Sequence, residues 1–483
     1  MAERRRRWRW SLVVVSTAAL LERADEALLP AVYREVGAAL GASPTTLGYL
    51  TLCRSLVQAV CYPLAMYAAA RYDRARVVAV GAILWAAATL LVGVSGSVLQ
   101  MALARGSNGV GLALAVPAIY SLVADYSSDA TRGSAFGWVL MAQTVGYIVG
   151  TCIGLLLAPK SFLGVPGWRL AFFVVALLSV AIAALVWAFA SDPRPSVRKD
   201  AAARTATLAD LLREAKDVAR VPTFGITVVQ GTIGSIQWSA FSFFAMLMEL
   251  IGFTHLQTSV VTGVSSLANL LGMVCAGHVG DKMAQRFPRA GRIAVGQVLT
   301  AATIPLAAVL LLAFPNDPSF WGAYAVACFA FAFVVCWYPV STNNPIFAEI
   351  VPEKARTTVY ALGMFIGSVF SSFGSPLVGI LAERVFGYQS DRTPGKSAEA
   401  DRKNATALSK AMCSEIAVPI GICCLMYTAL YWTYPKDKQR AQMAALHDQD
   451  GDGEASVVDD ASAAHGSDHH PLLPGTEPGN NKV

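Results

Sequence analysis

The sequence predicts an all-α membrane protein whose twelve transmembrane helices form two six-helix bundles. Of its 483 residues, 55% are hydrophobic and only 14% are charged, whereas soluble proteins carry about 25% charged residues. The apolar residues also gather into long runs, and a helix of about 20 residues is needed to cross ~30 Å of hydrocarbon. Finally, the basic residues between the runs fall on one side if successive runs alternate in direction.

Twelve apolar runs are long enough to span a bilayer, and they fall into two groups of six. The runs cover residues 11–36, 45–70, 77–95, 98–123, 133–158, 169–190, 223–249, 256–280, 292–314, 319–342, 357–383 and 411–434. We therefore expect a basic N-terminus over 1–10, one bundle over 11–190 and a second over 223–435. The charged segment 191–222 between them is expected to be a cytoplasmic loop with a short amphipathic surface helix.

The distribution of basic residues predicts that both termini lie in the cytoplasm. The opposite side is nearly free of lysine and arginine until the loop 385–409, which contains four basic residues and the glycosylation-type sequence Asn404-Ala405-Thr406. The basic residues on the expected cytoplasmic side are Arg4 to Arg7, Arg9, Arg71, Arg74, Arg76, Arg194, Arg198, Lys199, Arg204, Arg213, Lys216, Arg220, Lys282, Arg286, Arg289, Arg292, Lys436, Lys438 and Arg440.

The tail over 436–483 is rich in Asp, Ser and Gly, so we expect it to be disordered. It contains Asp448-Gln449-Asp450-Gly451-Asp452-Gly453, which imitates the start of a calcium loop but lacks a following helix. Further on, Asp468-His469-His470-Pro471-Leu472-Leu473 resembles an acidic dileucine sorting signal. The plasma membrane and an endomembrane such as the vacuolar one are therefore both open as locations.

The first apolar run contains four ionisable residues within five positions, Glu22, Arg23, Asp25 and Glu26. Each such side chain near the centre of a bilayer costs roughly 2.5–3.5 kcal/mol on insertion scales, so it must be paired or face water. Arg54 in the second run and Arg105 in the fourth lie at a depth similar to that of Glu26, ~10–14 Å below the outer surface. The three acids and three arginines therefore balance in charge, as a low-dielectric interior demands.

Two interpretations of this charged set remain open. It can be a structural ion-pair network that locks the first, second and fourth runs together. Alternatively, Glu22, Asp25 and Glu26 form a proton-coupling site that lines a central cavity, with Arg23, Arg54 and Arg105 balancing them or binding an anionic group of a substrate. Glu22 is the favoured coupling acid because it lies nearest the midplane.

In the second bundle we identify only neutral polar residues at comparable depth. Each of them is either part of an interhelical hydrogen bond or a wall of a substrate pocket. These candidate pocket residues are Gln230, Gln237, Trp238, Asn269, Tyr338 and Asn343, with Asn344 beside them. The difference predicts that coupling chemistry lies in the first bundle and that the second bundle shapes the pocket.

Two acid–arginine pairs recur at equivalent places in the two bundles. Asp125 precedes Arg132 by seven residues, and Glu349 precedes Arg356 by the same interval. Repeats of this kind are typical of transporters whose substrate site lies between the halves. We therefore expect both pairs to act as cytoplasmic gate latches.

Three motifs carry a family resemblance. Arg105-Gly106-Ser107-Asn108-Gly109-Val110-Gly111 follows an R-x-x-x-G-x-G pattern, and Gly277-His278-Val279-Gly280-Asp281-Lys282 follows G-x-x-x-D-[RK]. The fifth run places Gly146, Gly150 and Gly154 on one face. Together with two halves of six spans, these motifs resemble the major facilitator superfamily over about residues 10–435. Asp281 and Lys282 would then belong to a gate loop.

Within that superfamily, Glu22-Arg23 followed by Leu28-Leu29-Pro30 resembles the spinster-type branch, and the N-terminal half resembles plant members of it. The first gate loop departs from the family pattern. It reads Ala69-Ala70-Arg71-Tyr72-Asp73-Arg74-Ala75-Arg76, so Ala70 stands at the usual acidic position and Asp73 is displaced by three residues. The role of Asp73 in the gate is therefore open.

The resemblance implies proton-coupled secondary active transport of a small organic solute by alternating access, and the three arginines favour an anionic or amphipathic solute. It implies a monomer in a lipid bilayer without cofactor, metal or nucleic-acid partner, and not an enzyme. The nine cysteines show no metal-type spacing and are interpreted as apolar packing residues. A transport-inactive receptor or scaffold of the same fold is the alternative, because the first gate loop is degenerate.

Overall fold

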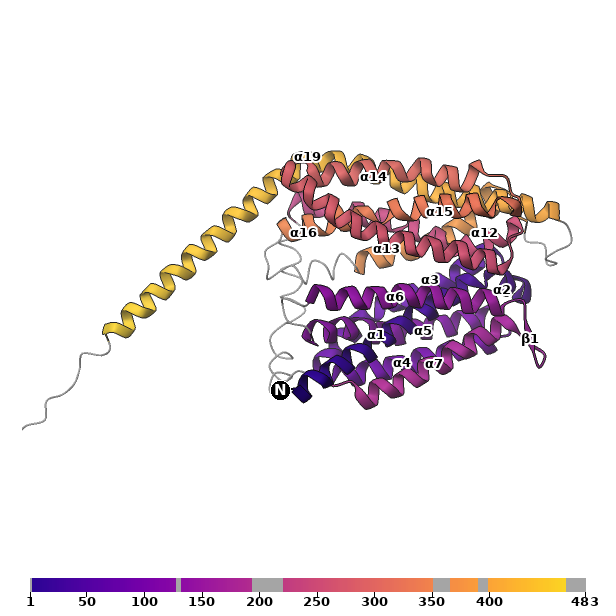
Figure 1. The fold of residues 1–483 in the computed structure, drawn as a ribbon, viewed down its shortest axis with the longest axis horizontal. Coiled ribbons are helices and arrows are strands. Elements are labelled where there is room, and N and C mark those ends of the chain that lie inside the picture. The colour runs from indigo at the N-terminus through magenta and orange to yellow at the C-terminus, as the bar shows by residue number, and fades with distance from the viewer. Residues whose placement is uncertain (1, 127–131, 193–219, 351–364, 390–397, 466–483) are drawn as a thin grey trace, which may run out of the picture.

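The computed structural model describes residues 2–126, 132–192, 220–350, 365–389 and 398–465, and these are almost entirely helical (Figure 1). Two bundles of roughly parallel helices lie side by side. The N-terminal half contains α1 to α7, and the C-terminal half contains α10 to α19. Among the described residues the only sheet is a hairpin of β1 (Ser161–Phe162) and β2 (Val165–Pro166).

The helices of the N-terminal half agree with the first six predicted spans, except that the first span is divided. Pro30 has no backbone N–H to donate, and the helix ends directly after it. A second helix then begins beyond Val32, whose φ of −120° is not helical. The elements are α1 (Ala2–Ala31), α2 (Tyr33–Leu40), α3 (Pro44–Arg71), α4 (Arg74–Val94), α5 (Val98–Tyr126), α6 (Arg132–Leu157) and α7 (Gly167–Phe189).

The helices of the C-terminal half are more interrupted than the sequence predicts. Several predicted spans change helical geometry part-way, with short 3₁₀ or π-helical turns, which are common at functional sites. The elements are α10 (Pro222–Ser235), α11 (Gln237–Ala240), η1 (Phe241–Phe243), α12 (Phe244–Ile251), α13 (His255–Arg286), α14 (Gly291–Ala308), η2 (Val309–Ala313), η3 (Pro318–Phe320), α15 (Trp321–Val335), η4 (Pro339–Asn343), α16 (Asn344–Ile350), α18 (Gly374–Ile380), η6 (Leu381–Val385) and α19 (Ala398–His465).

Ten helical segments of the described chain are long and apolar enough to cross a membrane. The long helices α1 and α3 bring the total to the twelve predicted spans. They differ from the ten because they carry the charged residues of the first span and Arg54. The predicted all-α, twelve-helix membrane architecture is therefore confirmed.

The two ends of the bundle differ, and we name them by what they carry. The terminal end is where the N-terminus lies and where α19 leaves the bundle, and the hairpin end carries β1 and β2 (Figure 1). At the hairpin end one apolar cluster includes residues of both halves, such as Leu28 and Val36 with Phe243 and Leu247. Towards the terminal end the clusters separate. One contains Val78 and its neighbours in the N-terminal half, and another lies wholly in the C-terminal half.

Two glycines bring the backbones of the halves together at the hairpin end. A Cβ atom on Gly48 of α3 would lie 2.6 Å from the carbonyl oxygen of Ser375, and one on Gly379 of α18 would lie 2.4 Å from Thr45. The Thr45 amide also donates a 2.8 Å hydrogen bond to Glu383. The halves are thus joined tightly at this end, and their apolar cores separate towards the other.

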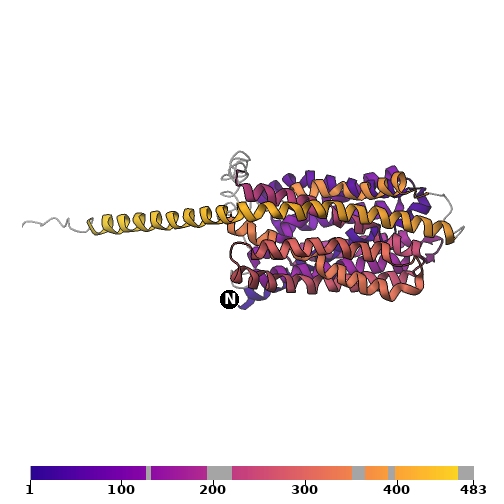
Figure 2. The ribbon, with the colours of Figure 1, turned by 90° about the horizontal axis from the view of Figure 1, so that it is seen from above.

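The C-terminal tail differs from the expected disordered segment over 436–483. The last helix continues without a break to His465 and projects beyond the bundle (Figure 2). Helix-favouring residues such as Lys436 to Leu446 allow this continuation. The calcium-loop-like stretch from Asp448 therefore lies within a helix, which is not the conformation of a calcium loop. The dileucine-like motif at 468–473 lies outside the described residues.

Candidate functional site

Two of the four charged residues at positions 22–26 of α1 are buried, and the other two are partly exposed. Glu22 and Asp25 are buried, whereas 41% of the Arg23 side chain and 31% of the Glu26 side chain are exposed. Around α1 pack α5, α6 and α7 of its own half, with η1 and α12 of the other half. Helices of both halves therefore border α1, and part of the Arg23 side chain is accessible to solvent.

The predicted glycine face on α6 explains how α1 is held so closely. A Cβ atom on Gly146 would lie 2.0 Å from the Leu20 carbonyl oxygen, and one on Gly150 would lie 2.2 Å from that of Ala24. Only glycine permits this backbone approach between helices. The position of the charged residues is thus fixed by the packing of α6 on α1.

Glu26 contacts two arginines, of which Arg54 connects α1 to α3. Its Oε1 atom lies 2.6 Å from Nη2 of Arg54, and its Oε2 atom accepts a hydrogen bond from Arg23. Glu22 is held less strongly, because its Oε2 atom lies 3.5 Å from Nε of Arg23 and accepts a 3.3 Å hydrogen bond from Gln143 of α6. The four charges of Glu22, Arg23, Glu26 and Arg54 therefore form one chain of contacts.

Asp25 does not belong to that chain, which corrects the expectation of a single six-charge network. Its carboxylate accepts hydrogen bonds from Thr89 of α4 and, at 2.9 Å, from Asn108 of α5. These neutral donors come from α4 and α5, whereas Arg54 comes from α3. Asp25 thus connects α1 to α4 and α5 through hydrogen bonds from uncharged donors.

Arg105 also departs from the expected one-to-one pairing. It is 1% exposed and forms no ion pair with any described residue, although Asp25 and Glu26 are among the charges near it. Its Nε atom has no hydrogen-bond partner in the described part of the chain. Arg105 therefore contributes positive charge to this region without a carboxylate of its own.

The C-terminal half contains a buried acid that sequence reasoning missed. Glu415 of α19 is 2% exposed, and neither of its carboxylate oxygens has a hydrogen-bond partner among the described residues. A Cβ atom on Gly374 would lie 2.6 Å from Glu415 Oε1, so the glycine leaves room for the carboxylate. Glu415 is the only charged residue in the predicted span 411–434. The reasoning that singled out the charges of α1 would have found it there.

Most candidate pocket residues are engaged with one another. Asn343 donates to Gln230 at 2.7 Å and accepts from Tyr427 at 2.9 Å. Gln237 donates to Tyr338 at 3.4 Å. These contacts connect η4, α10, α11 and α19 by interhelical hydrogen bonds, the structural alternative considered for these residues.

Two of the candidate pocket residues differ from this pattern. Trp238 of α11 has 40% of its surface exposed, so it can contact a solute. Asn269 is partly buried, and its backbone carbonyl oxygen accepts a weak hydrogen bond from the Cys336 thiol. Trp238 is therefore the most accessible of the predicted pocket residues.

The gate residues of the C-terminal half form a chain of ion pairs at the terminal end. Arg292 lies 3.0 Å from Asp281 and 3.1 Å from Glu349, and Lys438 lies 2.7 Å from Glu349. Burial raises the pKa of Glu349, but the hydrogen bonds from Lys438 and Tyr434 and the charges of Lys438 and Arg292 outweigh it and hold this pKa below its usual range. Lys282 is exposed.

All the described partners of Glu349 belong to its own half. Arg292 and Lys438 were not predicted as partners, because they come from helices distant in sequence. The side chains of Asp125 and Arg132, and the whole of Arg356, lie outside the described residues. The predicted latches between these residues therefore stay a prediction.

The displaced Asp73 of the N-terminal half has a local role. Its carboxylate caps α4 by accepting hydrogen bonds from the amides of Ala75 and Arg76. The neighbouring Arg74 pairs with Asp192, with Nη2 2.8 Å from Oδ1, and both side chains are buried. This pair joins the start of α4 to the chain that follows α7. Sequence reasoning missed Asp192 because it lies at the edge of the central loop.

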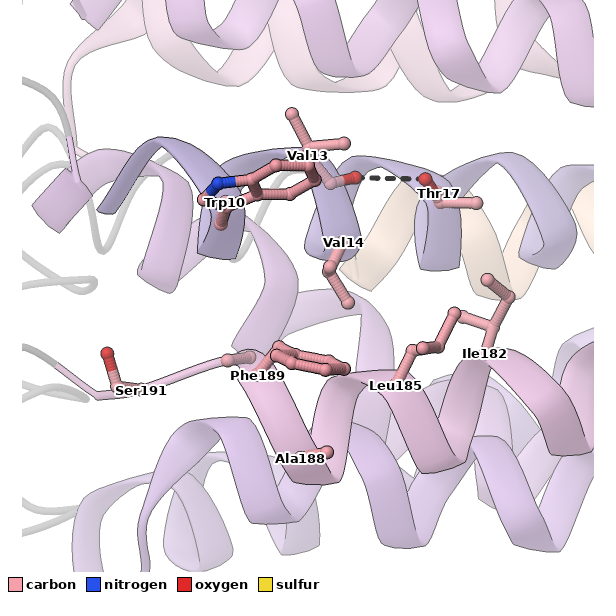
Figure 3. Close-up of a pocket in the computed structure, with 10 residues that line it drawn as sticks. Trp10, Val13, Val14, Thr17, Ile182, Leu185, Ala188, Phe189 and Ser191 are labelled. Atoms are coloured by element: carbon pink, nitrogen blue, oxygen red, sulfur yellow. Dashed lines mark hydrogen bonds between the residues drawn. The ribbon is translucent and has the colours of Figure 1, made fainter. Parts of the chain in front are cut away.

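A groove of about 820 Å³ lies between α1 and α7 near the terminal end. In Figure 3, Val14 of α1 points towards Phe189 and Leu185 of α7. The residues that line the groove are Trp10, Val13, Val14, Thr17, Ile182, Leu185, Ala188, Phe189, Ala190 and Ser191, none of which is ionisable. The lining does not include the charged residues at positions 22–26, so the groove is separate from them. Its exposed apolar side chains suit contact with lipid.

Comparison with known proteins decides the family. Residues 15–375 match the model of the Major Facilitator Superfamily. The chain belongs to this superfamily. It is therefore an integral multi-pass membrane transporter and not an enzyme.

Two relatives within the superfamily illustrate this similarity. The cis,cis-muconate transport protein of Acinetobacter baylyi is 23% identical over 78% of this chain and 88% of its own length. Protein spinster of Drosophila melanogaster is 25% identical over 68% of this chain, which spans about half, 54%, of that protein.

A solved structure supports the same fold. It is that of a bacterial homologue of the human lysosomal transporter Spinster in an inward-facing, unoccupied conformation. It superimposes with a TM-score of 0.72 and 20% identity, over 89% of this chain and 98% of that one. The resemblance of this superfamily member to the spinster-type branch is thus confirmed.

Proposed function

We propose that this superfamily member is a proton-linked secondary active transporter that moves a small organic solute by alternating access. In this proposal the basic terminal end faces the cytoplasm, following the positive-inside rule. The joined hairpin end and the separate cores at the terminal end then correspond to an inward-facing state, with the monomer as the transport unit. Rocking of the halves about the central site would open the hairpin end and close the terminal end.

The observation that carries proton coupling is the unequal pairing of Glu22 and Glu26. Glu26 contacts both Arg23 and Arg54 closely, whereas Glu22 has a 3.5 Å contact to Arg23 and one amide donor. Glu22 can therefore accept a proton while Arg23 keeps its contact with Glu26. When Glu22 releases the proton, Arg23 has a second acid to bind. Protonation at Glu22 thus changes the interactions of an arginine that is partly exposed.

Arg23 also supports an anionic or amphipathic solute. Its side chain is partly exposed, and a guanidinium binds carboxylate or phosphate groups by paired hydrogen bonds. The exposed indole of Trp238 offers an apolar surface in the other half. The relative named a cis,cis-muconate transport protein agrees with an anionic cargo.

A transport-inactive receptor or scaffold with the same fold is the second candidate. The observation that favours it is the first gate loop, where Asp73 serves as the cap of α4. A receptor would retain ligand binding to the same residues but would move no solute. Either candidate is compatible with a plasma-membrane or vacuolar location.

The test begins with a ligand-stabilisation screen of the purified protein and continues with uptake of the hit into proteoliposomes. We expect a pH gradient to drive accumulation, and a protonophore to reduce it to simple equilibration. The Glu22→Gln variant should lose accumulation and keep exchange of labelled for unlabelled solute. Binding without any flux would instead favour the receptor, and unchanged accumulation in the variant would remove Glu22 from the coupling role.

A further inference from the structure

Three side chains that can bind a metal meet where the two halves join at the hairpin end. Glu35 comes from α2 in the N-terminal half, and Glu249 and His255 come from α12 and α13 in the C-terminal half. One potential ligand atom from each lies within 4.8 Å of the other two. Among the described residues this is the one such group of three, and it crosses the boundary between the halves.

Glu249 has no partner that satisfies its carboxylate. Its side chain is 3% exposed, and neither oxygen has an aligned hydrogen-bond donor in the described part of the chain. Nδ1 of His255 lies 2.9 Å from Oε1 of Glu249, but without hydrogen-bond alignment. Nε2 of the same ring lies 3.9 Å from Oε1 of Glu35, whose other oxygen is also unsatisfied. A buried carboxylate in this condition is costly unless a cation neutralises it.

The arginine nearest to the group does not form an ion pair with its carboxylates. Arg34 lies beside the group, but its Nη2 atom pairs with Asp401 at 2.8 Å. Its Nη1 atom donates to the backbone carbonyl oxygen of Glu249 instead of the carboxylate. With Arg34 and Asp401 balancing each other, the carboxylates of Glu35 and Glu249 and the ring of His255 form a separate group, in which a metal ion would take the place of a proton on the imidazole. One divalent cation would then neutralise both carboxylates.

We propose that Glu35, Glu249 and His255 bind a divalent transition-metal cation of the Zn²⁺ class, which clamps the two halves together at the hairpin end. An imidazole nitrogen and carboxylate oxygens suit such a cation, and water can occupy a fourth position. Small side-chain rotations would bring the ligand atoms to about 2.0–2.2 Å from the metal. His255 is 27% and Glu35 19% exposed at their side chains, so the ion can enter from solvent.

Because the ligands come from both halves, the cation would bind more tightly when the hairpin end is closed. It would therefore stabilise that conformation over one in which the halves have separated there. This consequence does not depend on the identity of any transported solute or on proton coupling. It makes the group a candidate inhibitory or regulatory metal site.

The first test measures Zn²⁺ binding to the full chain in nanodiscs by titration calorimetry. The background protein carries alanine at the four tail histidines, His447, His465, His469 and His470, to remove competing ligands. We expect one Zn²⁺ per chain, and binding at least about tenfold weaker in Glu249→Gln and His255→Ala. The matched control His278→Ala, which changes an exposed histidine of α13, should bind as the background does. Equal binding in His255→Ala and the background, or no binding in either, would overturn the proposal.

A second test needs no ligand variant, so it decides the matter even if Glu249→Gln and His255→Ala fail to fold. Spin labels at Phe162 and Phe320, both exposed, report the distance between the halves at the hairpin end by pulsed electron resonance. The background is the full chain without native cysteines. Zn²⁺ should narrow the distance distribution towards its short component, and a chelator should reverse the change. A distribution that Zn²⁺ leaves unaltered would contradict the clamp.

Discussion

The two halves of the molecule handle buried charge differently. In the N-terminal half, Glu22, Arg23, Glu26 and Arg54 form a chain in which each ion has an opposite charge within contact distance. In the C-terminal half, buried amides and phenols bond one another, and the buried acid Glu415 has no partner among the described residues. The difference teaches that the first half has ion pairs around Glu22 and Glu26, whereas the described ion pairs of the second half lie at its two ends. Protonation of Glu22 leaves Arg23 in contact with Glu26, whereas the buried hydrogen bonds of the second half join uncharged side chains.

The largest expected effect tests whether the ion pairs of the N-terminal half hold it together. Arg54→Met removes the 2.6 Å partner of Glu26, and breaking a buried pair in this way costs about 3 kcal/mol. Arg105→Met is the matched variant, because Arg105 is equally buried but has no ion pair in the described structure; we expect a loss below about 1 kcal/mol. Thermal unfolding followed by tryptophan fluorescence measures both. Equal losses of unfolding free energy in the two variants would support the single network of six charges that the sequence predicts.

A smaller effect tests the neutral network of the C-terminal half. Asn343→Ala leaves the buried Gln230 and Tyr427 without the partner that each has in the structure. The expected loss of unfolding free energy is about 1–2 kcal/mol. Gln297→Ala removes one exposed and one partly buried hydrogen bond to α19 and should cost less than Asn343→Ala in the same assay. If Asn343→Ala unfolds like the parent protein and loses ligand binding, the network belongs to the pocket and not to the scaffold.

The smallest effect concerns pH and the ion pairs at the terminal end. Since its pKa is lowered in the folded protein, Glu349 contributes stability that is present above the ordinary glutamate pKa of about 4.3 and is lost as the pH falls through the folded value. Glu349→Gln should therefore unfold at a lower temperature than the parent at pH 7, and the difference should shrink as the pH falls below about 4.3. Asp281→Asn, at a 65% exposed carboxylate, should show a weaker effect. A difference that is constant with pH would exclude this ionic contribution.

The sequence predicted the architecture and the charged residues of α1 for physical reasons that operate locally. Run length specifies spans, basic residues indicate orientation, and helical spacing places Gly146 and Gly150 on one face. That spacing shows which residues share a face, but not which neighbouring helix lies opposite. Asp25 was therefore expected to balance an arginine, whereas its carboxylate accepts hydrogen bonds from Thr89 and Asn108.

The remaining differences have a similar origin. The pairs Arg74–Asp192 and Arg292–Glu349 join residues distant in sequence, so their geometry depends on tertiary packing. Glu415 is a different case, because its position in an apolar span was visible and was overlooked. Its burial without a partner, and the room left by Gly374, could be known only from the structure.

The most direct test of the central claim, that coupling belongs to the N-terminal half, compares Glu22→Gln with Glu415→Gln. Each replacement removes one buried acid from one half with little change in shape. Proteoliposomes loaded with a pH-sensitive dye report the proton movement that a gradient of the transported solute drives. The account predicts such movement in the parent and, within about twofold, in Glu415→Gln, and at least a tenfold loss in Glu22→Gln. Undiminished proton movement in Glu22→Gln, together with its loss in Glu415→Gln, would contradict the account and assign coupling to the C-terminal half.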